Sequence, residues 1–275
     1  MRKLFYMAVS ILMLSCIPTP IPITPGNGGT TITVGGHLYT LTWSEEFNYT
    51  GLPDPAKWGY EVGYVRNGEA EYYTDHRLEN CKVENGILHL TALNDSFEGH
   101  PVTSASIITK GLQSFKYGYL EVRAKMPHLG IGTWPAIWTL GDNIDAVGWP
   151  RCGEMDIMEW LGRDPSKVMG TLHMAEANDD HVSHGASYTV PPSSLVTAAF
   201  HNYAVEWDST KIKFFFDNIN YGTFTKGDFG ATPWDAMTKD HYLILNLAMG
   251  GGFGGTIDYT KFPYTFEVEY VRYYK

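Results

Sequence analysis

The chain has 275 residues, of which 44% are hydrophobic and 14% aromatic, and it carries a formal net charge of −10. This length suits one large all-β domain or two smaller domains. The negative charge argues against nucleic acid or an anionic membrane surface as a partner, because both repel an acidic protein. Planar rings beside acidic groups suit uncharged sugars better.

The first residues have the features of an export signal. Arg2 and Lys3 form a basic start, residues 4–14 are an apolar run too short to span a bilayer, and a small residue precedes Cys16. Residues 1–16 are therefore interpreted as a signal peptide of an extracellular or cell-surface protein. The junction resembles a bacterial lipoprotein signal, in which Cys16 would be lipidated and anchor the chain. Ordinary cleavage, which leaves Cys16 as a thiol, is the alternative.

Residues 17–36 are rich in Pro, Thr and Gly, a composition that favours an extended linker over a packed core. Residues 37–275 show no further shift in composition, so we expect one domain. We also expect the protein to be a monomer. Cys81 and Cys152 lie in this part. They could form a disulfide in an oxidising compartment or remain two free buried thiols, and the sequence leaves both open.

Short segments of alternating polar and apolar residues follow one another through the domain, without sustained helical periodicity. They span residues 87–93, 117–126, 133–140, 168–174, 202–207, 211–217, 241–248 and 265–274. Turns rich in Gly and Pro separate them. This pattern predicts an all-β chain, folded as a β-sandwich or jelly roll of two antiparallel sheets.

The alternation also predicts which faces are buried. In residues 117–126, Leu120 and Val122 share an apolar face, and Tyr119 and Glu121 share the opposite face. We expect the first face in the core and the second in water. Residues 211–217 divide in the same way.

The segment Glu154-Met155-Asp156-Ile157-Met158-Glu159 is the most informative part of the sequence. Glu154 and Asp156 alternate with apolar residues and therefore share one face of a strand. Strict alternation would bury Glu159, which is costly for an unpaired carboxylate. One extra residue, a β-bulge near Ile157 or Met158, would return Glu159 to the face of the other two acids.

Three carboxylates on one face repel one another, so at least one should hold its proton at neutral pH. Cleavage of a glycosidic bond with retention needs such a set: an ionised carboxylate to attack the anomeric carbon, and a protonated one about 5–5.5 Å away to protonate the leaving oxygen. Asp156, between the two, could hydrogen-bond the nucleophile. The alternatives are a solvated strand face that blocks edge pairing, and a calcium or manganese site to which His173 adds a ligand.

The acid segment resembles the E-x-D-x-x-E signature of glycoside hydrolase family 16, in the bulged form of laminarinases, agarases and carrageenases. The resemblance extends over residues 43–47, 52–55, 118–126, 132–138, 170–173, 201–207 and 245–251. It thus covers nearly all of residues 40–275. It implies a β-jelly-roll sandwich with a concave substrate cleft.

By this resemblance Glu154 is the nucleophile, Asp156 the assisting acid and Glu159 the acid/base, with His173 close to the acid/base. The Trp-Pro-Ala-x-Trp and Asn-Leu-Ala-x-Gly-Gly segments look most like the β-1,3-glucanase branch. The resemblance therefore implies a secreted, retaining endo-β-1,3-glucanase that acts on laminarin-like polysaccharide and needs no cofactor for catalysis.

Substrate contacts are expected around these acids. The indole rings of Trp134 and Trp138 can stack on sugars, and Trp160 also follows the acids directly. Asn246 belongs to the Asn-Leu-Ala-x-Gly-Gly segment.

A second group of substrate contacts is expected upstream. Arg66, Asn67 and Glu69 lie in a segment similar to the family's sugar-contacting Asn-Asn-Glu-Leu-Gln-Tyr-Tyr. Here Gly68 replaces the second Asn and Glu71 replaces the Gln, and a turn with a solvated charge cluster is the alternative.

Many members of the family bind a structural calcium ion on the convex side, away from the catalytic residues. Glu46, Gly86 and Glu269 are the matching positions, with Glu269 where the family usually has Asp. The resemblance thus implies a calcium site at these three residues.

Two further functions remain open from the sequence. The same fold and mechanism could act on agarose, carrageenan or mixed-linkage glucan, although sulfated polymers would favour a basic cleft. The chain could instead be a non-catalytic glycan-binding sandwich, but such a protein would be expected to have lost Glu154 or Glu159, and both are present.

Overall fold

The computed structural model describes residues 23–25, 30–128 and 130–275. The predicted signal peptide, with Cys16, and half of the predicted linker lie outside these residues. Within the described ranges, no helix is long and apolar enough to cross a membrane.

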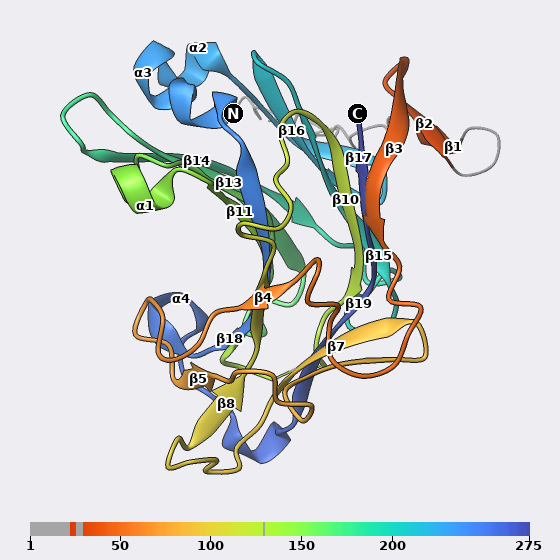
Figure 1. Ribbon diagram of the computed structural model, residues 1–275, viewed down its shortest axis with the longest axis vertical. Coiled ribbons are helices and arrows are strands. Elements are labelled where there is room, and N and C mark those ends of the chain that lie inside the picture. Colours follow the sequence, from red (N-terminus) through yellow and green to blue (C-terminus); the bar gives the residue numbers. More distant parts are fainter. Residues whose placement is uncertain (1–22, 26–29, 129) are drawn as a thin grey trace, which may run out of the picture.

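Two antiparallel sheets face each other as layers (Figure 1). In the described part of the chain the larger sheet has ten strands. Its order is β1 (Ile23–Pro25), β2 (Thr31–Val34), β3 (His37–Glu45), β19 (Tyr264–Tyr274), β10 (Gly118–Lys125), β15 (His201–Trp207), β16 (Lys211–Phe216) and β17 (Ile219–Thr225), with β7 (Ile87–Ala92) also paired to β19 and β6 (Cys81–Glu84) paired to β7.

The second sheet supplies the residues around the acids. Its order is β14 (His181–Thr189), β13 (Lys167–Ala175), β12 (Glu154–Glu159), β11 (Thr133–Gly141), β18 (His241–Met249), β9 (Ser106–Ile108) and β4 (Gly59–Tyr60). A small parallel pair joins β5 (Glu71–Tyr73) to β8 (Val102–Ser104). The helices are single turns: α1 (Ile144–Val147), α2 (Lys226–Phe229), α3 (Ala231–Trp234), α4 (Gly251–Gly254) and the 3₁₀ turns Asp235–Thr238 and Tyr259–Lys261.

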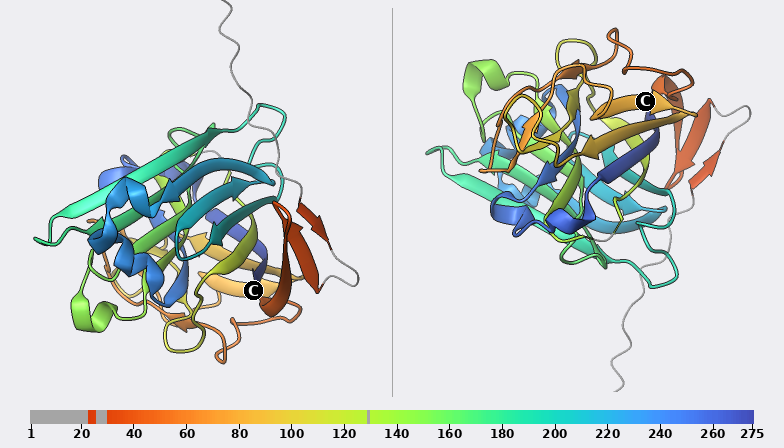
Figure 2. Two further views of the ribbon diagram at one scale, coloured as in Figure 1. Left: turned by 90° about the horizontal axis from the view of Figure 1, so that it is seen from above. Right: turned by 90° about the horizontal axis from the view of Figure 1, so that it is seen from below.

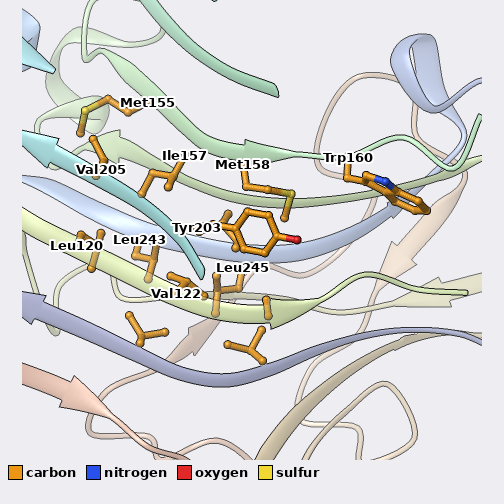
Figure 3. Close-up of a cluster of buried hydrophobic side chains, with 14 of the residues drawn as sticks. Leu120, Val122, Met155, Ile157, Met158, Trp160, Tyr203, Val205, Leu243 and Leu245 are labelled. Atoms are coloured by element: carbon orange, nitrogen blue, oxygen red, sulfur yellow. The ribbon is translucent and has the colours of Figure 1, made fainter. Parts of the chain in front are cut away.

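The main core fills the space between the sheets (Figure 3). The larger sheet contributes Leu120 and Val122 from β10 and Tyr203 and Val205 from β15, and the second sheet contributes Met155, Ile157 and Met158 from β12 and Leu243 and Leu245 from β18. Burial of each such side chain stabilises the fold by roughly 1.5–3 kcal/mol. All nine residues of β18 are buried, because one face of this strand meets the core and the other lies under the cleft.

The sequence pattern located most of the sandwich. The eight predicted segments correspond to β7, β10, β11, β13, β15, β16, β18 and β19, and every end agrees within one residue. The pattern missed strands that are short, such as β4 and β5, or polar, such as β14. Such strands lack the run of alternating apolar residues on which the prediction depends.

The outer face of the larger sheet is not entirely exposed to solvent. Tyr119 and Glu121 were expected in water, but they are only 1% and 7% exposed. Ile32 and Val34 of β2 pack with Tyr119 in a second apolar cluster, and Figures 1 and 2 show β3 beside the C-terminal strand β19, with β2 next to β3. The N-terminal strands therefore cover part of this face.

The same strands correct the linker boundary. Thr31–Val34 lie inside the range interpreted as linker, yet they form β2 and pair with β3. The surrounding Pro and Gly residues masked a four-residue alternation, so the folded part begins before residue 37.

The two cysteines of the domain are free. Cys81 and Cys152 are both buried and unbonded to each other, and they belong to different apolar clusters. Burial raises the pKa of the Cys81 thiol to about 12 and that of Cys152 to about 11. The free-thiol alternative is therefore correct.

Candidate active site

A β-bulge in β12 brings the acids together, as the sequence predicts. On β11, Ile137 pairs with Met158 and the next residue, Trp138, pairs with Asp156, so Ile157 is the extra residue. The pairing with β13 is also interrupted between Asp156 and Glu159. The apolar residues of β12 point into the core (Figure 3), and Glu154, Asp156 and Glu159 line one cavity on the opposite face.

Gly153 sets the start of this strand. Its φ is +79°, and a Cβ at this position would lie 2.8 Å from Cβ of Ala236 and 2.7 Å from Cε of Met237. Only glycine adopts this conformation without strain and leaves room for the 3₁₀ turn against it. The chain therefore enters β12 at a fixed angle, which directs Glu154 into the cavity.

The cavity has a volume of about 850 Å³ and is lined by all the predicted substrate contacts except Trp160. Trp134 and Trp138 come from β11 and Asn246 from β18, next to the acid strand. Arg66, Asn67 and Glu69 come from the loop after β4. On the other side of β12, His173 of β13 and His181 of β14 also line the cavity. The cleft thus extends across the sheet on both sides of the acids.

Glu154 is held by two neighbours. Trp149 donates its indole Nε1–H to Oε2 of Glu154 over 2.6 Å, and Nε2 of His173 lies 4.0 Å from Oε1. Trp149 precedes the acid strand by a few residues and is 50% exposed. Sequence reasoning missed it, although its position in a Trp-Pro turn directly before the acids was a usable signal.

Asp156 lies deepest of the three acids, at 4% exposure. Nε2 of His173 is 3.0 Å from its Oδ2, and Nδ1 of His173 is 2.8 Å from Nε2 of His181. The resemblance implied that His173 lies near the acid/base, but its close contacts are with Asp156 and Glu154. The register explains this difference, because His173 pairs directly with Glu154 across the strands.

Glu159 stands at the other end of the trio. Trp134 donates its indole Nε1–H to Oε1 of Glu159 over 3.0 Å. The ring of Phe253 meets Trp134 edge-on, with centroids 5.3 Å apart, and also lines the cavity. Aromatic surface therefore flanks Glu159 and restricts water around it.

Burial raises the pKa of all three acids. The pKa of Glu154 rises to about 8, through burial and then the charge of Asp156, and that of Glu159 rises to about 7, through burial and the charge of Glu154. The pKa of Asp156 is well above its usual range, because the side chain is buried and faces Glu159. The trio therefore retains protons at neutral pH.

The acids also have the ligand types of a cation site. Ligand atoms of Glu154, Asp156 and His173 lie within 4.8 Å of one another. His173 and Asp156 already bond each other, and Glu154 accepts a hydrogen bond from Trp149. The arrangement of these three side chains is thus compatible both with a bound cation and with hydrolysis.

The floor of the cleft beside the acids is a connected hydrogen-bonded surface. Trp138 donates Nε1–H to Oδ1 of Asn246 over 2.8 Å. The guanidinium of Arg66 lies 4.8 Å from the centre of the Trp138 ring and is paired with Glu61. These contacts fix the ring of Trp138 in one orientation, so a sugar would meet a preformed platform.

Trp160 does not belong to the cleft. It is fully buried in the main core and donates its indole Nε1–H to the carbonyl of Pro165 over 3.2 Å. The bulge turns Glu159 toward the cavity, and the next residue consequently points inward.

The three predicted calcium ligands come together on the convex side but do not fit a cation. Glu46, Gly86 and Glu269 line one cavity. Arg272 forms a bidentate ion pair with Glu46, with N–O distances of 2.9 and 2.8 Å, and Arg123 bonds Glu269 over 2.5 Å. Both carboxylates are therefore neutralised by guanidinium groups, which would also repel an added cation.

Comparison with known proteins agrees with the site. A model of glycosyl hydrolases family 16 matches residues 68–260. The β-glucanase of Rhodothermus marinus is 40% identical over 253 residues, covering 86% of this chain and 85% of that protein.

Solved structures lead to the same family. The laminarinase of Rhodothermus marinus superimposes with a TM-score of 0.79 at 39% identity, over 86% of this chain and 97% of that one. The laminarinase catalytic domain of Thermotoga maritima gives 0.77 at 38% identity, over 86% and 98%. The fold, the bulged acid strand and a family match over more than half of the sequence agree, and this chain belongs to glycosyl hydrolase family 16.

Proposed function

We propose that this protein is a retaining endo-β-1,3-glucanase, with Glu154 as nucleophile and Glu159 as acid/base. The observation that carries the proposal is the bulge at Ile157, which directs both carboxylates into one cavity. Similarity over most of the chain to a β-glucanase, to a glucan endo-1,3-β-glucosidase and to laminarinases supports the substrate class.

The proposed reaction has two displacements. Glu154 attacks the anomeric carbon, the glycosidic C–O bond breaks, and Glu159 gives its proton to the departing oxygen. Water then attacks the glycosyl ester of Glu154 while Glu159 takes a proton from it. The β configuration is thereby restored, and both acids return to their first state.

The surroundings of the acids support this division of roles. Glu154 and Asp156 share a hydrogen bond, so their protons belong to the pair. In the free site Glu154 holds this proton, since its pKa is about 8, and it passes the proton along the hydrogen bond to Asp156 when it attacks, with Trp149 as the remaining donor. Glu159 lies in the drier, aromatic end, where its raised pKa keeps it protonated up to about pH 7. Activity should therefore fall as the pH rises above about 7.

Charge in the cleft supports an uncharged polymer. Its two basic side chains, Arg66 and Lys110, are paired with Glu61 and Asp145 respectively. The remaining charged groups of the lining are acids, apart from any protonated histidine. A sulfated chain such as carrageenan would meet no unpaired lysine or arginine there.

The extent of the cleft supports cleavage within a chain. Arg66, Asn67 and Glu69 line it on the β18 side of the acids, and Trp149 and His181 line it on the β13 side. Sugar units can thus occupy both sides of the cleaved bond.

We further propose that the chain is exported, lipidated at Cys16 and monomeric. The basic start, the short apolar run and the small residue before Cys16 support export and lipidation. Labelling with a fatty-acid analogue in cells, compared between the native chain and Cys16→Ser, tests the anchor, and light scattering tests the monomer.

The main experiment compares native protein, Glu154→Gln and Glu98→Gln on laminarin, lichenan, agarose and carrageenan. Glu98 is an exposed acid outside the cleft and serves as a matched control. We expect new reducing ends from laminarin, first products of β configuration, oligosaccharides of mixed length, and no activity only in Glu154→Gln. Binding of laminarin without hydrolysis by the native protein would instead establish a glycan-binding sandwich.

A further inference from the structure

The carboxyl groups of Glu69 and Glu71 lie within hydrogen-bonding reach of each other, apart from the catalytic trio. Glu69 lines the cavity and is 8% exposed, and Glu71, the first residue of β5, is buried behind it at 1% exposure. Where two acids touch at such burial, a proton between them is expected.

Glu69 has the partners of an ionised, oriented carboxylate. Asn67 donates Nδ2–H to its Oε1 over 3.0 Å, and Tyr73 donates its hydroxyl to Oε2 over 3.3 Å. The Tyr73 hydroxyl itself accepts from Nδ2 of Asn246 over 2.9 Å. Since Asn246 also accepts from Trp138, a chain of hydrogen bonds connects the sugar platform to Glu69.

Glu71 has a different set of partners. The backbone N–H of Met249 donates to its Oε2 over 2.8 Å. Its Oε1 is buried without a donor, and the Glu69 carboxyl group lies within hydrogen-bonding reach of the Glu71 side chain. If both groups were ionised, two acceptors would meet out of water, so a proton on Glu71 is the arrangement that satisfies both.

The other charged and titratable groups around this pair are few. The hydroxyl of Tyr73 contacts Glu69. Arg66, which is paired with Glu61, interacts electrostatically with Glu69 and Tyr73. From β18 the pair meets the backbone N–H of Met249 and, through Tyr73, the amide of Asn246. Burial and then the charge of Glu69 raise the pKa of Glu71 well above its usual range.

We infer that Glu71 is a positioning residue for glucan binding, a neutral carboxylic acid that donates a hydrogen bond to Glu69 and keeps the Glu69 carboxylate directed at sugar hydroxyl groups. This inference rests on the proposed function. Glu71 also connects the segment of Glu69 to the end of β18 through Met249, and Glu69 bridges to Gly250 there. Loss of the Glu71 proton would leave two adjacent carboxylates that repel each other, and Glu69 would be displaced from the sugar.

The test measures binding of a laminari-oligosaccharide by calorimetry between pH 5 and pH 9. All proteins carry Glu154→Gln, which prevents hydrolysis, and are compared with and without E71Q. The amide of E71Q has the shape of Glu71, accepts from Met249 and donates to Glu69 at every pH. We expect equal affinity at pH 5, a loss of at least about tenfold with rising pH when Glu71 is present, and a smaller loss with E71Q.

A control and an independent measurement complete the design. Glu69→Gln removes the negative charge of the group that faces the sugar and replaces one of its two acceptor oxygens by a donor, so it should weaken binding at pH 5 as well. Infrared spectra should contain a protonated carboxylic acid band that E71Q removes, and this measurement needs no ligand.

The outcomes separate the two proposals. Identical pH dependence with and without E71Q, or no change in the infrared band, overturns the role of Glu71 and leaves the glucanase intact. Absence of binding at every pH, together with absence of hydrolysis by the native chain, overturns both.

Discussion

Trp149 and Glu154 are joined by a 2.6 Å hydrogen bond from the indole Nε1–H to Oε2 of the carboxylate. The donor comes from the loop before β12, and the acceptor is the first residue of that strand. The bond favours the ionised form of Glu154, which is the form that attacks the sugar.

Trp149→Phe should therefore slow the reaction without unfolding the protein. A hydrogen bond to a charged group stabilises by about 1.5–3 kcal/mol, so we expect kcat on laminarin to fall roughly 10- to 100-fold. Val147→Ala, at the end of α1 just before this loop and outside the cavity lining, is the control and should keep native kcat. A native rate in Trp149→Phe would contradict the role of this bond.

Glu159→Ala tests the acid/base by the dependence on the leaving group. Hydrolysis of laminarin should fall by about 10²- to 10⁴-fold. An aryl β-glucoside oligomer with an acidic phenol should still form the glycosyl ester, because its leaving group needs no proton. Added azide should then restore turnover and yield the β-glycosyl azide. Equal losses on both substrates, without rescue by azide, would reject this assignment.

The buried acids predict an unusual dependence of stability on pH. The pKa of Glu154 in the folded state, about 8, lies above its value in the unfolded chain. Its contribution to stability is therefore complete below the unfolded pKa and is lost as the pH rises through the folded pKa.

At pH 7 the unfolded chain releases the Glu154 proton and the folded protein retains it, so this carboxyl group destabilises the fold. Glu154→Gln removes the effect and should raise the free energy of unfolding by an amount on the order of 3 kcal/mol at pH 7. Its Tm should exceed that of the native protein by several degrees at pH 8 and by much less at pH 5. Glu98→Gln should follow the native curve at both pH values. A constant difference in Tm across this range would show that Glu154 titrates normally.

The two arginine pairs on the convex side predict that calcium does not stabilise this protein. Because Arg272 and Arg123 occupy the carboxylates of Glu46 and Glu269, neither EDTA nor millimolar calcium should change the native Tm. The double variant Arg123→Gln, Arg272→Gln frees both acids, and its Tm should rise with calcium. A calcium-dependent Tm in the native protein would contradict the conclusion that Arg123 and Arg272 take the place of a calcium ion.

The sequence by itself determined the fold class and the chemistry of the site. Alternation along β7 and β13 reports which face of each strand is buried, and three acids in one segment restrict the reactions they can perform. The bulge could also be predicted, since burying Glu159 alone would have been too costly.

Only the tertiary structure decided which distant residues complete these local patterns. Trp149 reaches Glu154 because Gly153 and the turn before it fold back over the strand, and Glu71 lies beside Glu69 beneath residues of β18. Arg272 and Arg123 meet Glu46 and Glu269 across paired strands, and β2 covers Tyr119 from outside the sandwich. A local pattern records whether a side chain is buried, but the identity of its neighbour is set by strand order and register, which join residues far apart in the chain.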